Sequence, residues 1–307
     1  MSILSRKYFH SEPAAFAYLE SILWPDGPVC PHCGVIDNAG KLKGKSTRIG
    51  VWKCYACRKQ FTVKVGTVFE HGRIPLHKFL QATYLMCSSK KGVSAHQLHR
   101  TLEVTYKTAW FLAHRIREAM REGRVPGGLG GPNKVVEADE TFVGGKAKNA
   151  KRGRPVPVKE AVFALVERDG HVSSHHVPSV TAKTLRPILV THVSRKSYLM
   201  TDEAGQYITV GREFAGHGSV NHSADEYVRG KFWHTNTVEG YFSILKRGIY
   251  GVYQHVSQQH LKRYLGEFDF RYNYRTALGV DDHQRTESAL AGIVGKRLTY
   301  AVTDSAI

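Results

Sequence analysis

The stretch His234–Lys246, HTNTVEGYFSILK, predicts a helix with two different long faces. One stripe is polar and, at spacings of i, i+3, i+7 and i+10, consists of Asn236, Glu239, Ser243 and Lys246. The neighbouring stripe is apolar and consists of Val238, Phe242, Leu245 and Ile249. An ordinary amphipathic helix with a solvated polar side has the same spacing. The interpretation therefore depends on what this helix meets in the fold.

Two aspartates upstream each belong to a β-like run. Lys134–Val143, KVVEADETFV, carries Asp139 near its centre, and residues 197–201 form a short strand that ends at Asp202. An acidic group inside a strand is costly to bury unless it meets a cation. If Asp139, Asp202 and Glu239 converge, they can hold two Mg²⁺ or Mn²⁺ ions about 3.5–4 Å apart for in-line phosphodiester cleavage or transfer. Spacing alone does not establish that they meet, because acidic residues are mostly on the surface.

Basic residues accompany these carboxylates. Lys246 lies two turns after Glu239 on the same face, followed by Arg247, and both could contact a DNA backbone. The segment Gly144–Lys159 contains basic residues and no acid until Glu160, among them Lys151, Arg152 and Arg154. As a loop it could grip phosphates, although basic loops are often only solvated.

The remaining pieces of residues 134–280 predict a mixed sheet with flanking helices. Two strands, Glu160–Arg168 and His171–Val177, are joined by a turn at Asp169-Gly170. Thr181 could cap a helix that continues through Val193, and Ser257–Thr276 has a helical core face. The His-rich segment Phe214–Arg229 is expected to be irregular.

Four of the five cysteines form two CxxC pairs, Cys30-Pro-His-Cys33 and Cys54-Tyr-Ala-Cys57. Each pair can occupy a tight turn, so that four thiolates surround one ion tetrahedrally. With short β-like pieces between and after the pairs, the spacing predicts a zinc ribbon with structural Zn²⁺. Redox CxxC chemistry and free thiols are the alternatives.

Residues 75–122 predict a run of helices. Ser94 could cap a short helix over Ala95–Leu102, and after a turn Thr105 could cap a longer one to Glu122. This arrangement resembles a helix-turn-helix whose second helix carries the candidate DNA-binding residues Lys107, His114, Arg115 and Arg117. A plain helical hairpin with a solvated basic face is the alternative. The Gly- and Pro-rich stretch that follows, GRVPGGLGGP, predicts a linker.

The net charge of the chain indicates which class of molecule it binds. The 307 residues contain 44 Lys+Arg against 26 Asp+Glu, a net charge of +18, which indicates a polyanion and most readily nucleic acid. No apolar run approaches about 18 residues and no basic amphipathic segment favours a membrane surface. No signal peptide is evident, and paired cysteines with metal spacing suit a reducing compartment. We expect a cytoplasmic protein, associated with the nucleoid when it is bound to DNA.

These motifs together resemble the insertion-sequence transposases of the DDE class that carry an N-terminal zinc ribbon. The resemblance rests on CPHC…CYAC, VVEADETFVGG, YLMTDEAGQY and the long run that begins HTNTVEGYFSILKRGIYG. It implies a ribonuclease H-like catalytic fold, Mg²⁺-dependent cleavage of donor DNA and transfer of the 3′-OH end into target DNA. It also implies binding of the element's terminal inverted repeats and action as a homo-oligomer.

The expected architecture is multidomain α+β. Its parts are an N-terminal helix plus zinc ribbon (1–70), a helix-turn-helix-like region (71–122), a linker (123–133), a ribonuclease H-like catalytic domain (134–280) and a C-terminal short helix and tail (281–307).

The resemblance leaves one catalytic position open, since related enzymes use either Glu or Asn as the third group. We prefer Glu239 as the metal ligand because its charge helps to neutralise two divalent ions, with Asn236 as a neutral ligand or a supporting residue. Asp139 is preferred over Glu140, which strand alternation puts on the opposite face, and Asp202 over Glu203. Two other functions stay open: a DNA-binding regulator without catalysis, and a metal nuclease or resolvase that cuts without joining.

Overall fold

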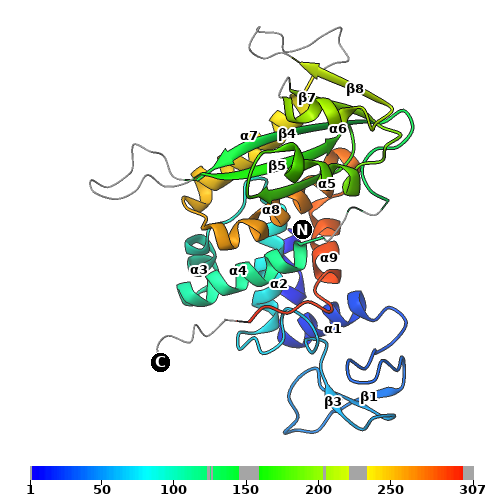
Figure 1. Cartoon of the computed structure of the whole chain (residues 1–307). Coiled ribbons are helices and arrows are strands. Elements are labelled where there is room, and N and C mark those ends of the chain that lie inside the picture. Colours follow the sequence, from blue (N-terminus) through cyan, green and yellow to red (C-terminus); the bar gives the residue numbers. More distant parts are fainter. Residues whose placement is uncertain are drawn as a thin grey trace, which may run out of the picture. The chain divides into compact units, whose positions relative to one another are not determined.

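The computed structural model describes residues 2–122, 125, 127–144, 159–202, 205–220 and 234–299. The chain divides into two compact units (Figure 1). The first consists of residues 1–89, 93–121 and 281–307, and the second of residues 90–92 and 122–280. In the described part of the chain, no helix combines the length and the hydropathy that crossing a bilayer would require.

A small antiparallel sheet begins the first unit. Its strands are β1 (Ala39–Lys41), β2 (Trp52–Cys54) and β3 (Gln60–Phe61), in the order β1-β2-β3. The preceding helix α1 (Glu12–Leu23) holds this sheet through Glu20, whose carboxylate accepts Trp52 Nε1 at 3.0 Å and Lys41 Nζ at 2.8 Å. Trp24 then packs edge-on against Trp52 and Phe61. The short β1 was not expected from its sequence, Ala-Gly-Lys, which has little strand character.

Four helices complete the first unit: α2 (Leu76–Ser88), α3 (Ala95–Leu102), α4 (Tyr106–Met120) and α9 (Asp282–Ala291). The expected caps are present. Ser94 Oγ accepts the backbone N–H of Gln97 at 3.1 Å, and Thr105 Oγ1 accepts that of Thr108 at 3.3 Å. Glu103 between the helices has a left-handed backbone, φ 52°, which produces the tight turn. α4 ends at Met120, two residues before the expected end.

The C-terminal helix belongs to the first unit and packs against α2. A capping box of Asp281 and Gln284 starts it, and Arg285 Nη1 donates to the carbonyl of Cys87 at 3.0 Å. Leu290 and Ile293 have no exposed surface. The sequence predicts a short helix and a tail here. The structure shows in addition that residues 282–293 contribute to a hydrophobic core.

The second unit contains a five-stranded mixed sheet (Figure 1) with the order β6-β5-β4-β7-β8. The strands are β4 (Val135–Val143), β5 (Glu160–Glu167), β6 (Val172–Val177), β7 (Tyr198–Asp202) and β8 (Gly216–Val220). β4, β5 and β6 pair antiparallel, whereas β7 is parallel to β4 and β8 is parallel to β7. The expectation that Phe214–Arg229 is irregular is wrong for Gly216–Val220, which becomes a strand by pairing with β7; residues 221–233 lie outside the described residues.

Different helices cover the two faces of this sheet. Val136 and Ala138 of β4 contribute to a core with α5 (Ala182–His192) and α6 (Ile208–Gly211). On the other face, Val143 and alternate residues of β5 pack against α7 (Asn236–Gly248) and α8 (Gln258–Asn273). A π-helical turn, Ile249–Tyr253, links α7 to the segment before α8. By alternation, Glu137, Asp139 and Val143 share the α7 side of β4.

Candidate active site and zinc site

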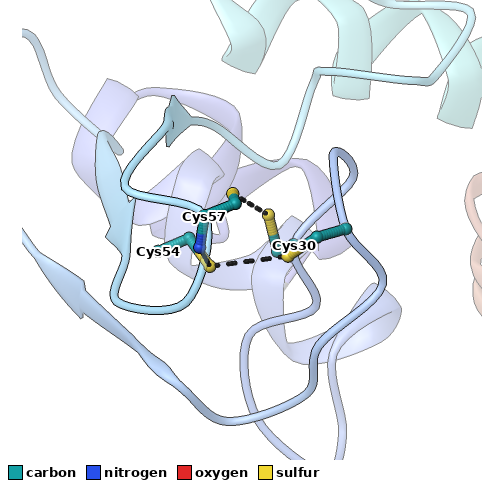
Figure 2. Close-up of side chains that lie close together, drawn as sticks. Cys30, Cys54 and Cys57 are labelled. Carbon is teal, nitrogen blue, oxygen red and sulfur yellow. Dashed lines mark hydrogen bonds between the residues drawn. The ribbon is translucent and has the colours of Figure 1, made fainter.

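The four cysteines converge in the first unit. The Sγ atoms of Cys30 and Cys57 are 3.7 Å apart, as are those of Cys33 and Cys54. Figure 2 shows the sulfur atoms of Cys30, Cys54 and Cys57 turned toward one another. A tetrahedral Zn²⁺ site with Zn–S bonds of about 2.3 Å requires sulfur atoms about 3.8 Å apart. The observed separations fit that geometry and are far too long for disulfide bonds.

The surroundings also suit a structural zinc ion. Cys30 and Cys54 are fully buried in a small apolar cluster with Phe61. The backbone N–H of Cys57 donates to Cys54 Sγ at 3.5 Å, and such donors lower the pKa of the Cys54 thiol to about 7. All four groups of this cluster are cysteine thiols, and their sulfur atoms lie within 4.8 Å of one another. The site is therefore a closed structural Zn²⁺ site of the zinc-ribbon type.

We expect Cys30→Ser to release the zinc ion and to unfold the small sheet, because the buried cluster around this sheet is small without the metal. Zinc content measured by atomic absorption should fall from about one ion per chain to near zero, and proteolysis should cut residues 24–65. Cys87→Ser is the matched control, since Cys87 is a buried thiol of α2 outside the cluster. Full zinc content in the Cys30 variant would contradict a four-cysteine site.

Asp139 occupies the middle of β4, the central strand, on the side covered by α7. Its Oδ1 accepts the backbone N–H of Glu140 at 2.7 Å. Burial raises the pKa of Asp139 to about 7; the Glu140 N–H opposes this shift, and the carboxylates of Glu140, Asp202 and Glu239 add to it. Asp139 is thus a half-buried acid whose pKa is influenced by both other predicted site residues.

Asp202 and Glu239 approach from neighbouring elements. Asp202 ends β7, which is hydrogen-bonded to β4, and Glu239 lies in the first turn of α7. Thr235 Oγ1 donates to Glu239 Oε1 at 3.1 Å. Among the described residues, only the four cysteines lie close enough together to be a ready-made metal cluster. Asp202 and Glu239 therefore lie near enough to raise the pKa of Asp139, but the three carboxylates do not lie at ligand distance from one another, as expected of like charges.

Glu140 lies on the other face of β4. Gln206 Nε2 donates to its Oε1 at 2.8 Å, and the Tyr207 hydroxyl donates to its other oxygen. Tyr207 belongs to the core formed with α5 and α6. Burial raises the pKa of Glu140, and the Tyr207 hydrogen bond opposes that shift. Glu203, the other rejected acid, lies outside the described residues.

The two stripes of the opening helix have the expected environments. Val238 and Leu245 have no exposed surface, and Ile249 is 3% exposed. Asn236 and Glu239 are exposed in the first turn, and they are followed along the polar side by half-buried Ser243 and Lys246 and by exposed Arg247. The side chains available on this surface therefore change from an amide and a carboxylate to two cations along about two and a half turns.

The predicted basic residues of α4 are mostly not on the surface. His114, Arg115 and Arg117 are 1%, 8% and 1% exposed, so their placement on a solvent-facing basic face is corrected. α4 is packed against α2, α3 and α9, and the sequence pattern does not reveal that so many neighbours surround it. The His114 ring lies 4.2 Å from that of Trp110, and Arg115 lies over the Phe111 ring. Lys107 near the start of α4 is exposed.

Lys151, Arg152 and Arg154 lie outside the described residues. Sequence analysis also missed Glu137, a fully buried acid two residues before Asp139 that contacts the start of α7. The signal was present in VVEADETFV, where Glu137 and Asp139 stand two residues apart with Ala138 between them. A strand face with an acid at two successive inward positions requires a partner for each.

The raised pKa of Asp139 predicts how stability changes with pH before any cation binds. The carboxyl group is protonated in both states below its ordinary pKa of 3.8. From there to about pH 7 the folded protein keeps a proton that the unfolded chain has lost, so stability falls as pH rises through this window. Asp139→Asn removes the charge, and its melting temperature at pH 8 should exceed that of the wild type by about 2–4 °C, with little difference at pH 4.

Circular dichroism in buffer freed of Mg²⁺ and Mn²⁺ measures this effect; a chelator is avoided because it would attack the zinc site. Glu213→Gln is the matched control, because its carboxylate pairs with Arg186 at 2.6 Å and its loss should not stabilise the protein. An Asp139→Asn variant that melts below the wild type at pH 8 would contradict the unfavourable charge at this position.

Comparison with known proteins adds two domain matches. Residues 128–273 match the ISXO2-like transposase domain, and residues 10–60 match the transposase zinc-ribbon domain. The first range contains β4 to α8, and the second contains all four cysteines. Together the two ranges cover more than half of the 307 residues.

Individual proteins are similar over different shares of the chain. A Halobacterium salinarum protein named "Uncharacterized protein in transposable element ISH50" is 29% identical over 86% of this chain and 92% of its own length. The Caenorhabditis elegans male abnormal protein mab-31 is 30% identical over 34% of this chain and 28% of its own. The Mos1 transposase paired-end complex with the left transposon end aligns with 73% of this chain and 77% of its own at 16% identity and a TM-score of 0.29.

The two domain matches and the insertion-element relative agree with the four-cysteine site and the mixed sheet. The chain belongs to the ISXO2-like insertion-sequence transposases, with the transposase zinc ribbon at its N-terminal side.

Proposed function

We propose that the chain cleaves DNA at the ends of its insertion sequence and transfers the 3′-OH end into target DNA, using Asp139, Asp202 and Glu239. The observation that carries this proposal is the placement of three carboxylates from β4, β7 and α7 near one another: burial is the main cause of the raised pKa of the half-buried Asp139, and the charges of Asp202 and Glu239 add to it. A structural role alone gives no reason to place three acids so close without a cation.

The donor set fits Mg²⁺ or Mn²⁺, which prefer carboxylate and amide oxygens. Two such ions, when bound, would activate the nucleophile and stabilise the leaving oxygen. Asp139, Asp202 and Glu239 would hold these ions through their carboxylate oxygens. Thr235 orients the Glu239 carboxylate, and Asn236 is available one turn earlier as a neutral ligand or a supporting residue.

The topology supports a ribonuclease H-like reading of the second unit. Three antiparallel strands are followed by two parallel ones, with the first strand of this unit, β4, at the centre of the sheet. Asp139 is on that central strand, and Asp202 is at the carboxyl end of the adjacent parallel strand. A rigid sheet is the kind of support that a two-metal site needs.

Duplex DNA is the proposed partner, both as the element's terminal inverted repeats and as target. Lys246 and Arg247 lie in the last turn of α7, at the opposite end from Glu239, and suit the backbone of the strand being cut. For end recognition we assign the exposed beginnings of α3 and α4, where the His96 ring stacks on Tyr106 at 4.3 Å and Lys107 follows. The N-terminal part of a second helix is the part that enters the major groove in helix-turn-helix proteins. The proposal includes action as a homo-oligomer in the cytoplasm.

A strand-transfer assay on the purified full chain tests the reaction. Its substrates are a duplex ending in the element's terminal sequence with a free 3′-OH and a supercoiled target, with Mg²⁺ added or omitted. We expect joined product only with Mg²⁺, and a loss of at least about 10³-fold in Asp139→Asn and Glu239→Gln with end binding retained. The control Glu213→Gln should retain activity, and Asn236→Ala should lose less than Glu239→Gln.

The outcomes separate the alternative functions. Binding without cutting or joining, on an end shown to be bound specifically, would favour a regulator. Cutting without joining would favour a nuclease or resolvase, which uses the same two-metal chemistry. Loss of binding in Asp139→Asn would contradict the division between a catalytic unit and a recognition surface.

End recognition by α4 has its own expected result. Lys107→Ala should weaken binding to duplexes of any sequence and reduce the slope of log affinity against log salt by about 1, because one phosphate contact is lost. Tyr106→Ala should weaken binding to the terminal sequence more than to unrelated DNA. Fluorescence anisotropy at several salt concentrations measures both. Lys7→Ala is the control, an exposed lysine of the first unit away from α3 and α4, and an equal effect there would argue against a localised surface.

A further inference from the structure

The start of α7 is capped by another element of the fold. A helix begins with backbone N–H groups that have no partner inside it, and a Ser, Thr, Asp or Asn at the N-cap usually accepts from the second or third residue. The N-cap of α7 is Thr235, but its side chain makes no such hydrogen bond. Thr235 Oγ1 instead donates to Glu239 Oε1. Thr235, the residue at the N-cap position, therefore hydrogen-bonds the Glu239 carboxylate and does not cap the helix.

Glu137 of β4 takes over the cap. Its Oε2 accepts the backbone N–H of Thr237 at 2.8 Å and that of Val238 at 3.0 Å, and its Oε1 accepts Thr237 Oγ1 at 2.9 Å. Thr237 and Val238 are the second and third residues of the helix, the two that a local N-cap would serve. The cap is supplied by a residue about 100 positions earlier in the chain.

The charge of Glu137 is also compensated. Its side chain has no exposed surface, and Arg168 Nε donates to Oε1 at 2.6 Å. Arg168 Nη2 donates in turn to the carbonyl of His234 at 2.8 Å, just before the helix, and His234 Nδ1 lies 3.2 Å from Glu137 Oε1. The Glu137 carboxylate thus connects the central strand β4 to Arg168, directly after β5, and to the residues just before and just after the start of α7. A buried anion with this many fixed partners leaves little freedom for the helix to slide.

This connection lies next to the site acids. Glu137 precedes Asp139 by two residues on one face of β4, about 6.5–7 Å along the strand. Thr237 precedes Glu239 by two residues of α7, about 3 Å along the helix axis. Because Mg²⁺ accepts its ligands at about 2.0–2.1 Å in near-octahedral geometry, a shift of α7 by a fraction of a turn would separate Glu239 from a shared ion.

We infer that Glu137 is a positioning residue of the transposase, which fixes α7 against β4 so that Glu239 and Asp139 can bind the same pair of divalent ions. The inference rests on the proposed function, because it assigns a supporting role to a residue behind the proposed metal ligands. Glu137 itself does not contact DNA or metal. Its effect passes through the first turn of α7 and through the Thr235–Glu239 hydrogen bond.

Glu137→Gln is the main test, since it preserves shape and keeps one accepting oxygen. Its NH2 group can only donate, and it must face either the N–H groups of α7 or the Arg168 and Thr237 side chains, all of which donate to Glu137. We expect end cleavage to fall about 10–100-fold at fixed Mn²⁺, as for other residues that orient metal ligands, and the Mn²⁺ concentration for half-maximal activity to rise by a similar factor. Independently of activity, the rise in melting temperature caused by Mn²⁺ should shrink or vanish. Thr237→Val, which keeps the backbone contacts, should show the same changes to a smaller degree and serves if the Gln variant does not fold.

Tyr241→Phe is the matched control on the same helix. The Tyr241 hydroxyl donates to Asp269 Oδ1 at 2.6 Å and also hydrogen-bonds Ser174, and these contacts hold α7 to α8 and β6. Tyr241 follows Glu239 by two residues in sequence, but its side chain lies on the buried face of the helix. Its loss should lower the melting temperature and leave the Mn²⁺ dependence unchanged. All assays are performed at a temperature where each variant is folded.

Three results would contradict either the positioning role of Glu137 or the proposed function. If Asp139→Asn abolishes cleavage while Glu137→Gln keeps wild-type activity and Mn²⁺ dependence, the positioning role is overturned and the proposed function stands. If Tyr241→Phe shifts the Mn²⁺ dependence as much as Glu137→Gln does, general stability and not the N-terminal contact is responsible, and the inference is overturned. If Asp139→Asn remains active, the proposed function itself has failed.

Discussion

A carboxylate cannot be buried without compensation, and the compensation of Glu137 determines much of the second unit. The effective cost of removing an unpaired ion from water is several kcal/mol. The first turn of α7 supplies two N–H groups at the positive end of the helix dipole, and Arg168 supplies a guanidinium. The helix is therefore held by charge at its start and by its apolar stripe against the sheet along the remainder.

Glu137 and Asp139 share one face of one strand and have opposite surroundings. Glu137 is enclosed by donors and a guanidinium, whereas Asp139 accepts the N–H of Glu140 and is influenced by three other carboxyl groups. The first is held by the start of α7 and by Arg168. The second has its charged form disfavoured by burial and by the neighbouring carboxyl groups. Both lie on the central strand of the sheet, which pairs with a strand on each side.

Periodicity in the sequence was sufficient to predict helices and strands that have one buried and one solvated face. It failed where a partner distant in sequence determines the structure or the burial of a residue. β4, β5 and α7 lie within a residue or two of the expected ranges, because alternation and the 3.6-residue period report directly on which side is buried. β8 has no such alternation and exists through its pairing with β7. The charged side chain of Arg117 predicts a position on the surface, yet this residue is buried between helices. Glu137 was overlooked because its partner is about 100 residues away.

The first unit is discontinuous in sequence, so its core depends on a segment near the end of the sequence. Its helical core is completed by α9, and Ala289, Leu290 and Ile293 are all fully buried. Burying three such side chains contributes about 4–8 kcal/mol before the entropy cost, a large share of the stability of a small unit. The catalytic unit lies between α4 and α9 in sequence. The boundaries expected from sequence, 71–122 and 134–280, would therefore divide one hydrophobic core, so the zinc-ribbon and helical unit reaches its full core only when the segment after the catalytic sheet has folded back.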